Sequence, residues 1–145
     1  MIVVVCPGQG SQAPGFLTPW LEIPEFQKSI EAQQEASGVN LIKHGTESDA
    51  ETIRDTAIAQ PLIVAAGVAT LSALLTGKSI SESGIAGVSG HSVGEITAAV
   101  VSGIFTEEAG IKFVNERGQA MAKAAALEPT SMAAVLGGDQ SEVEA

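Results

Sequence analysis

Cysteine, aromatic residues and basic residues are all scarce in this chain of 145 residues. It has one Cys and no Tyr, and aromatic residues make up only 3% of it. A single Cys cannot form a disulfide within the chain, which excludes a disulfide-stapled scaffold. With 45% hydrophobic and 17% charged residues, the chain is also too apolar for a disordered protein. Its core must be built from small residues such as Ala, Gly and Val, which is typical of α/β proteins.

Positive charge and long apolar runs are also in short supply. Seven Lys and Arg stand against 17 Asp and Glu, giving a net charge of −10 and a pI near 4.4, which argues against a nucleic-acid partner. The run Ile2–Cys6 is too short for a signal sequence, and the apolar stretch Leu62–Leu75 is shorter than a membrane span. We therefore expect a cytoplasmic, soluble protein without a membrane partner. Its length fits one domain that buries about 68–70% of its unfolded surface.

Apolar patterning predicts strands and helices in alternation. Strands are expected at Ile2–Cys6, which reads as buried, and at Ile85–Ser89 and Met132–Leu136. Helices are expected at Glu25–Ser37, Pro61–Leu75, Val93–Ser102 and Glu107–Leu127, the second of them with Pro at its first position. A further short helix is expected to begin at Ser48 and Glu51, which have the spacing of a capping box. This order favours an α/β layered fold. Asp139 and Glu142 have the spacing of a further capped helix, but the sequence stops at Ala145, within the first turn of that helix. We therefore expect the sequence to be a piece of a longer protein.

The strongest candidate for chemistry is the segment Gly90-His91-Ser92-Val93-Gly94, a G-x-S-x-G motif between a predicted strand and a predicted helix. A nucleophile elbow holds its Ser on a sharp, strained turn, from which the hydroxyl projects above the sheet. Gly90 and Gly94 suit this turn because side chains there would collide with neighbouring backbone. The N-terminus of the helix adds N–H donors for an oxyanion. The alternative is a Gly-rich turn whose Ser caps the helix.

A Ser nucleophile needs a base, and the sequence has only two histidines. His91 directly precedes Ser92, so the two side chains should diverge, and His44 is expected to be a solvated loop residue. In a hydrolase-like order the His follows the Ser, and no His does so here. Either Ser92 is not catalytic, or its base lies on sequence absent from this chain.

A second glycine-rich loop follows the first strand. Gly8–Ala13 reads as G-x-G-x-x-A, the form of a dinucleotide-binding turn, but Pro14-Gly15 should break the helix that such a turn requires. A better interpretation is a loop that presents backbone N–H groups near the top of the sheet, with one of them supplying an oxyanion donor opposite Val93. An ordinary glycine turn is the remaining alternative.

Three further side chains are candidates for binding. The apolar stripe of the helix Glu107–Leu127 consists of Ile111, Val114, Gly118, Met121 and Ala125. Arg117 lies at the border of this stripe, where it either snorkels to solvent or clamps a carboxylate through its fork of donors. Met121, one turn further on, is in position to wall the same pocket. Gln60 either caps the most apolar helix or contacts the substrate. Cys6 is expected to be a small core residue, and no His has a neighbour at metal-ligand spacing, so no metal is expected.

Four segments in this order and spacing are distinctive together: Pro7–Gln12, Gln60-Pro61, Gly90–Glu95 and Arg117. The chain resembles the malonyl-CoA:acyl-carrier-protein transacylases of fatty-acid synthesis and, more distantly, the acyltransferase domains of polyketide synthases. Its whole length resembles the N-terminal half of that family. The family fold implies an α/β-hydrolase-like large subdomain, here residues 1–128, with an inserted ferredoxin-like small subdomain that starts in residues 129–145 and is truncated.

The resemblance also implies roles for individual residues. Ser92 would be the acylated nucleophile, the backbone N–H groups of Gln9 and Val93 would form the oxyanion hole, and the malonyl carboxylate would bind Arg117. The other residues expected to contact the substrate are Gln60, His91 and Met121. The family's catalytic His would lie outside this sequence.

The implied activity is ping-pong transfer of a malonyl group from malonyl-CoA to the phosphopantetheine thiol of acyl carrier protein, without a bound cofactor and with the complete protein a monomer. A serine hydrolase and a non-catalytic module that binds CoA esters are the alternatives. A hydrolase would share the elbow without any need of Arg117.

Overall fold

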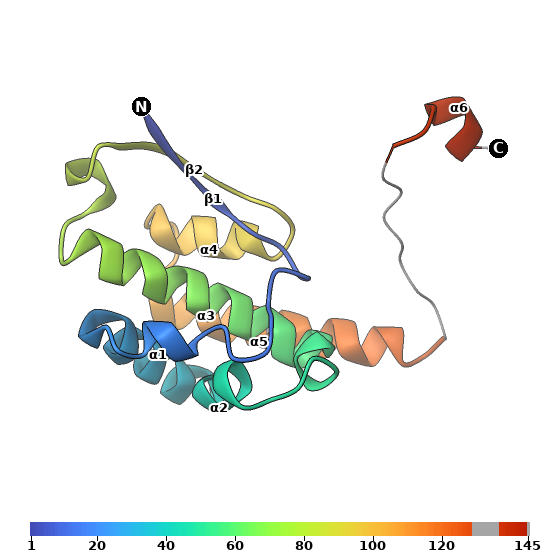
Figure 1. Ribbon diagram of the computed structural model, residues 1–145, viewed down its shortest axis with the longest axis horizontal. Coiled ribbons are helices and arrows are strands. Elements are labelled where there is room, and N and C mark those ends of the chain that lie inside the picture. Colours follow the sequence, from blue (N-terminus) through green and yellow to red (C-terminus); the bar gives the residue numbers. More distant parts are fainter. Residues whose placement is uncertain (129–136, 145) are drawn as a thin grey trace.

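The computed structural model describes residues 1–128 and 137–144, and Figure 1 shows their arrangement. The strand predicted at Met132–Leu136 therefore lies outside the described residues. The helices and strands in chain order are β1 (Ile2–Cys6), α1 (Pro24–Ser37), α2 (Leu41–Thr46), α3 (Thr56–Leu75), β2 (Ile85–Gly90), α4 (Gly94–Val101), α5 (Glu107–Ala125) and α6 (Gln140–Val143). Three short 3₁₀ turns are η1 (Thr18–Trp20), η2 (Thr52–Arg54) and η3 (Ile80–Glu82).

The two described strands form a parallel pair. Val4 lies opposite Val88 and Cys6 lies opposite Gly90, so both strands end at the same edge of the sheet. Parallel pairing therefore brings the loop after β1 beside the motif after β2, although more than 80 positions separate them in the sequence. The sheet places the two glycine-rich segments side by side.

The prediction that β1 is buried is wrong for all but its last residue. Cys6 is buried, but Val3 is 50% exposed and Val5 is 72% exposed. Helix α4 packs on both strands, and within residues 1–128 and 137–144 no second layer covers the other face of the sheet. A β-branched run is typical of a strand that is buried on both faces of a sheet, but the described residues cover only one face of this sheet.

Helix α3 is the centre of the core, and α1, α4 and α5 all pack on it (Figure 1). It begins at Thr56, not at Pro61 as predicted, because the Asp55 carboxylate accepts a hydrogen bond from the Ala57 N–H at 2.8 Å and caps the helix earlier. Pro61 lies inside the helix and is buried. By length and composition α3 would suit a membrane span, but more than half of it is buried inside the protein, as in a core helix.

Several local predictions near the helix ends are wrong. Helix α2 is not predicted by the sequence, and it carries His44, which is therefore not a loop residue; the His44 Nδ1 lies 3.0 Å from the Ser48 hydroxyl. The short helix predicted after Ser48 and Glu51 is present as the 3₁₀ turn η2, but the two residues form no capping box, since the Asp49 carboxylate accepts the Thr52 N–H at 2.8 Å instead. Helix α6 forms without a side-chain cap from Asp139.

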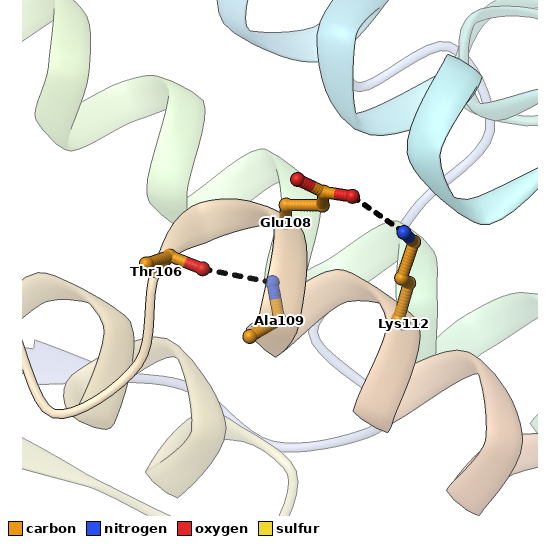
Figure 2. Close-up of polar contacts among 4 residues, drawn as sticks. All are labelled: Thr106, Glu108, Ala109 and Lys112. Carbon is orange, nitrogen blue, oxygen red and sulfur yellow. Dashed lines mark hydrogen bonds and ion pairs between the residues drawn. The ribbon is translucent and has the colours of Figure 1, made fainter.

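Helix α5 carries Arg117 and begins with a side-chain cap. The Thr106 hydroxyl accepts a hydrogen bond from the Ala109 N–H at 3.1 Å, and Glu108 pairs with Lys112 one turn further on (Figure 2). The predicted apolar stripe is buried at Ile111, Val114 and Gly118, whereas Met121 is partly exposed and Ala125 is exposed. The second half of α5 therefore leaves the core, and that half borders the site described below.

The Thr106→Ala variant is expected to lower the free energy of unfolding by about 1 kcal/mol, because the Ala109 N–H loses its acceptor. Thr106→Ser, which keeps the hydroxyl, should recover most of the loss. Urea unfolding of both variants checks this, and an unchanged midpoint for Thr106→Ala would contradict the capping role. Lys112→Ala should change the midpoint less, because its ion pair with Glu108 is exposed to solvent.

Candidate functional site

Ser92 lies in the short turn between the end of β2 and the start of α4. Its φ of +53° is in the left-handed region, where non-glycine residues are uncommon. Among the described residues only Thr76, at the end of α3, shares this feature outside glycine. A serine held in such a conformation between a strand and a helix has the backbone of a nucleophile elbow.

The two glycines of the motif are needed because backbone passes close to both. A Cβ on Gly94 would lie 2.3 Å from the carbonyl oxygen of Cys6 and 2.5 Å from that of Pro7. A Cβ on Gly90 would lie 2.3 Å from the carbonyl carbon of Gly94. The predicted collision with neighbouring backbone is confirmed at both positions, and it fixes the elbow against the end of β1.

The loop after β1 folds directly over the elbow. The His91 N–H donates to the Cys6 carbonyl at 3.0 Å, and a Cβ on Gly8 would lie 2.7 Å from His91 Nδ1. Gly10 turns the loop with a φ of +106°, and its N–H donates to Gln12 Oε1 at 2.8 Å. No helix begins at this loop, so the dinucleotide-binding alternative is wrong.

Amide side chains tie this loop to the start of α3. Gln9 Nε2 donates to the Arg54 carbonyl and to Thr56 Oγ1, both at 3.3 Å, and Gln12 Nε2 donates to the Ile53 carbonyl at 2.9 Å. Within the described residues, the backbone N–H groups of Gln9 and Val93 donate no hydrogen bond. These two donors, one from each loop, are therefore available to a ligand.

Gln60, Arg117 and Met121 form a connected group between α3 and α5. Arg117 Nη1 donates to Gln60 Oε1 at 2.5 Å, and Gln60 Nε2 lies 3.2 Å from Met121 Sδ. Gln60 is 1% exposed and lies in the second turn of α3, so the capping alternative is wrong for it. Arg117 is held by a neutral amide and by no carboxylate within the described residues. Its charge and remaining donors are available to an anion.

These segments surround a cleft of about 490 Å³. Its lining residues are Gln9, Gly10, Gln12, Pro14, Ala50, Ile53, Arg54, Thr56, Gln60, His91, Ser92 and Met121. Two of the predicted site residues are not in this lining: Val93 is buried, and Arg117 is connected to the cleft through Gln60. Arg54 is a cleft residue that the sequence analysis missed, because an exposed Arg in a polar segment carries no distinctive pattern.

Neither histidine is placed as a base for Ser92. His44 is on α2 and pairs with Ser48, and the His91 side chain lies against Gly8. No hydrogen bond joins either ring to the Ser92 hydroxyl in the described part of the chain. The cleft therefore has a strained Ser, with one unbonded N–H donor on Gln9 in its lining and another on the residue after the Ser, and its described residues contribute no base at the Ser.

Cys6 is expected to react slowly with iodoacetamide, since the thiolate is the reactive form. The residue is 3% exposed, and burial raises the pKa of its thiol. Alkylation of the folded protein near pH 7.5, followed by mass spectrometry, should be at least about tenfold slower than alkylation after unfolding. Equal rates would show that Cys6 is accessible and is not a core residue.

Comparison with known proteins gives one consistent result. Residues 3–145 match the family described as "Acyl transferase domain". The chain is 45% identical over 148 residues to the malonyl CoA-acyl carrier protein transacylase of Mycobacterium tuberculosis, covering 99% of this chain and 47% of that protein. The crystal structure of the M. tuberculosis enzyme superposes with a TM-score of 0.83 at 44% identity, again over 99% of this chain and 47% of the other.

A further solved structure shows a malonyl-transacylase in complex with the acyl-carrier protein of a type II polyketide synthase. It is 28% identical, with a TM-score of 0.73, and the match covers 85% of this chain and 39% of that one. The chain therefore spans about half the length of the curated relatives it matches.

Proposed function

Because the chain belongs to the acyl transferase domain family, we propose that it forms part of an enzyme of fatty-acid biosynthesis. This enzyme transfers a malonyl group from malonyl-CoA to the phosphopantetheine thiol of an acyl carrier protein. One observation carries the proposal: Ser92, in a strained elbow, shares a cleft with Gln9 and with Gln60, and Gln60 in turn binds Arg117. The names of the relatives support the choice of substrate and acceptor.

In the first half-reaction Ser92 Oγ attacks the thioester carbonyl of malonyl-CoA. A C–O bond forms and the C–S bond breaks, so that the thiol of CoA leaves with the proton that the Ser hydroxyl has lost. The N–H groups of Gln9 and Val93 stabilise the oxyanion of the tetrahedral intermediate, together with the N-terminal end of α4. The same donors serve in the second half-reaction, in which the thiol of the carrier protein attacks the acyl-enzyme: a C–S bond forms, the C–O bond to Ser92 breaks, and the thiol proton returns to Ser92 Oγ.

Arg117 determines which acyl group is transferred. A guanidinium matches a carboxylate in geometry and charge, and the malonyl group carries a carboxylate that an acetyl group lacks. Gln60 holds the guanidinium in place through Nη1, and Met121 contacts Gln60 from α5. His91 lines the cleft beside Ser92. The cleft thus selects for a short acyl chain that ends in a negative charge.

The base of this reaction is assigned to neither histidine of the chain, given their positions. Since the curated relatives are about twice as long, we propose that the base is supplied by sequence outside these 145 residues. In the same proposal, residues 1–128 belong to an α/β-hydrolase-like subdomain and residues 129–145 begin a ferredoxin-like one. The exposed face of β1 fits a sheet that continues into further sequence.

The test is a transfer assay with the product of the full reading frame and labelled malonyl-CoA. We expect label to move to holo-acyl carrier protein, with much slower release of free malonate. Release of malonate at the same rate with or without the carrier protein would identify a serine hydrolase instead. Binding of malonyl-CoA without any turnover would identify a non-catalytic binding module.

A further inference from the structure

Arg54 is the one Arg or Lys among the residues that line the cleft. It lies in η2, and its carbonyl accepts the hydrogen bond from Gln9 Nε2 that ties the loop after β1 to the start of α3. Its backbone is therefore fixed beside Gln9, whose own N–H is one of the two available donors. The position of Arg54 is set by the same contacts that build the site around Ser92.

The acidic residues near Arg54 do not neutralise it. The Asp55 carboxylate accepts the Ala57 N–H at 2.8 Å, and the Asp49 carboxylate accepts the Thr52 N–H at 2.8 Å. Hydrogen bonds from Thr52 hold the pKa of Asp49 below its usual value. Both carboxylates are engaged as caps, and within the described residues no ion pair includes Arg54. Its guanidinium is therefore unpaired in a chain whose net charge is −10.

The cleft has an inner and an outer side. Gln60 is buried and bonded to the partly buried Arg117, which marks the inner side, whereas Arg54 is exposed and marks the mouth. If the malonyl carboxylate lies against Arg117, the rest of the bound donor must extend out of the cleft through its mouth. Beyond the acyl group, both the CoA donor and the carrier-protein acceptor consist of a pantetheine arm that ends in phosphate.

We propose that Arg54 is a binding residue for a phosphate of the pantetheine carrier at the mouth of the cleft. This inference rests on the proposed function, and it names how that same site holds its substrate. A guanidinium binds phosphate oxygens through two parallel hydrogen bonds, so its geometry and its charge both match a phosphate group. A local positive charge also offsets the repulsion between an acidic protein and an anionic substrate.

The test compares three acyl donors with the product of the full reading frame: malonyl-CoA, malonyl-4′-phosphopantetheine and malonyl-pantetheine, of which the last has no phosphate. Arg54→Gln is expected to raise the KM for malonyl-CoA about threefold to tenfold, with kcat changed less than about twofold. The KM for malonyl-pantetheine should not change. The KM of Arg54→Lys for malonyl-CoA should lie between those of the unaltered protein and of Arg54→Gln, because Lys keeps the charge and loses the two parallel hydrogen bonds of the guanidinium.

The matched control is Lys28→Gln, which removes one positive charge from the exposed face of α1 and does not line the cleft. It should leave all three KM values unchanged. An Arg54→Gln effect that persists with malonyl-4′-phosphopantetheine assigns the phosphate common to CoA and the carrier protein. An effect confined to malonyl-CoA assigns the phosphates of its nucleotide part. Both results support the proposal.

Two results would overturn it. If Arg54→Gln behaves like Lys28→Gln, or raises the KM for malonyl-pantetheine as much as for malonyl-CoA, then Arg54 does not bind phosphate, although Ser92 is still acylated and the proposed function stands. If the unaltered protein is acylated by none of the three donors, the proposed function fails and this inference fails with it.

Discussion

Arg117→Ala is expected to reduce kcat/KM for malonyl transfer by about 30-fold to several thousandfold, which corresponds to about 2–5 kcal/mol. The guanidinium is partly buried and is held through Nη1 by Gln60, so its remaining donors are directed by a fixed partner. Its loss would remove the counter-charge proposed for the malonyl carboxylate. Transfer of an acetyl group, which has no carboxylate, should change far less.

The measurement is kcat/KM with malonyl-CoA and with acetyl-CoA for each variant. Lys123→Ala is the matched control, since it removes a positive charge from the same helix at an exposed position outside the cleft. It should affect neither donor. An equal loss for malonyl and acetyl transfer in Arg117→Ala would contradict the carboxylate clamp and would assign Arg117 a structural role.

Gly94→Ala is expected to slow acylation of Ser92 by at least about 100-fold, because small displacements of reacting groups are costly. The new Cβ would meet the carbonyl oxygens of Cys6 and Pro7, and neither backbone atom can move without shifting the end of β1 against the elbow. The rate of acyl-enzyme formation in rapid-quench experiments gives the size of the effect.

Gly87→Ala is the matched control for this variant. It is the same substitution in β2, where the new Cβ would meet only Val3 Cγ2 at 4.0 Å, an ordinary contact. It should acylate at nearly the rate of the unaltered protein. A Gly94→Ala protein that also acylates at that rate would mean that the close approach at Gly94 does not set the position of Ser92.

The sequence predicted those elements whose signal is local. Both described strands, the end of α1 at Gly38 and the end of α3 at Leu75 lie where β-branched runs and glycine indicate them. It misplaced the start of α3, because Pro61 is a stronger signal than Asp55, which provides the actual cap. Helix α2 has only six residues, too few to show a helical period. The exposure of β1 depends on which layers cover the sheet, and no local pattern reports that.

The site residues likewise differ in whether a local pattern predicts them or only the fold brings them together. Ser92 and its two glycines follow from the motif. The collision that requires Gly90 lies within the turn, whereas the collision that requires Gly94 is with the end of β1 and appears only in the fold. Gln60, Arg117 and the loop that contains Gln9 were candidates from their own positions in the sequence, and the resemblance to a family assigned their roles. Their contacts across α3, α5 and the loop after β1 appear only in the fold. Arg54 was missed by both routes, since its position in the cleft depends on the loop that binds its carbonyl.

In the proposed function Ser92 carries the acyl group. The most direct measurement is an intact-mass spectrum of the full reading-frame product, quenched after brief incubation with malonyl-CoA, followed by peptide mapping, with Ser92→Ala in parallel. We predict one malonyl adduct, located on the peptide that contains Ser92 and absent from the variant. An adduct that persists in Ser92→Ala, or no adduct on a protein that still transfers malonyl groups, would contradict the account.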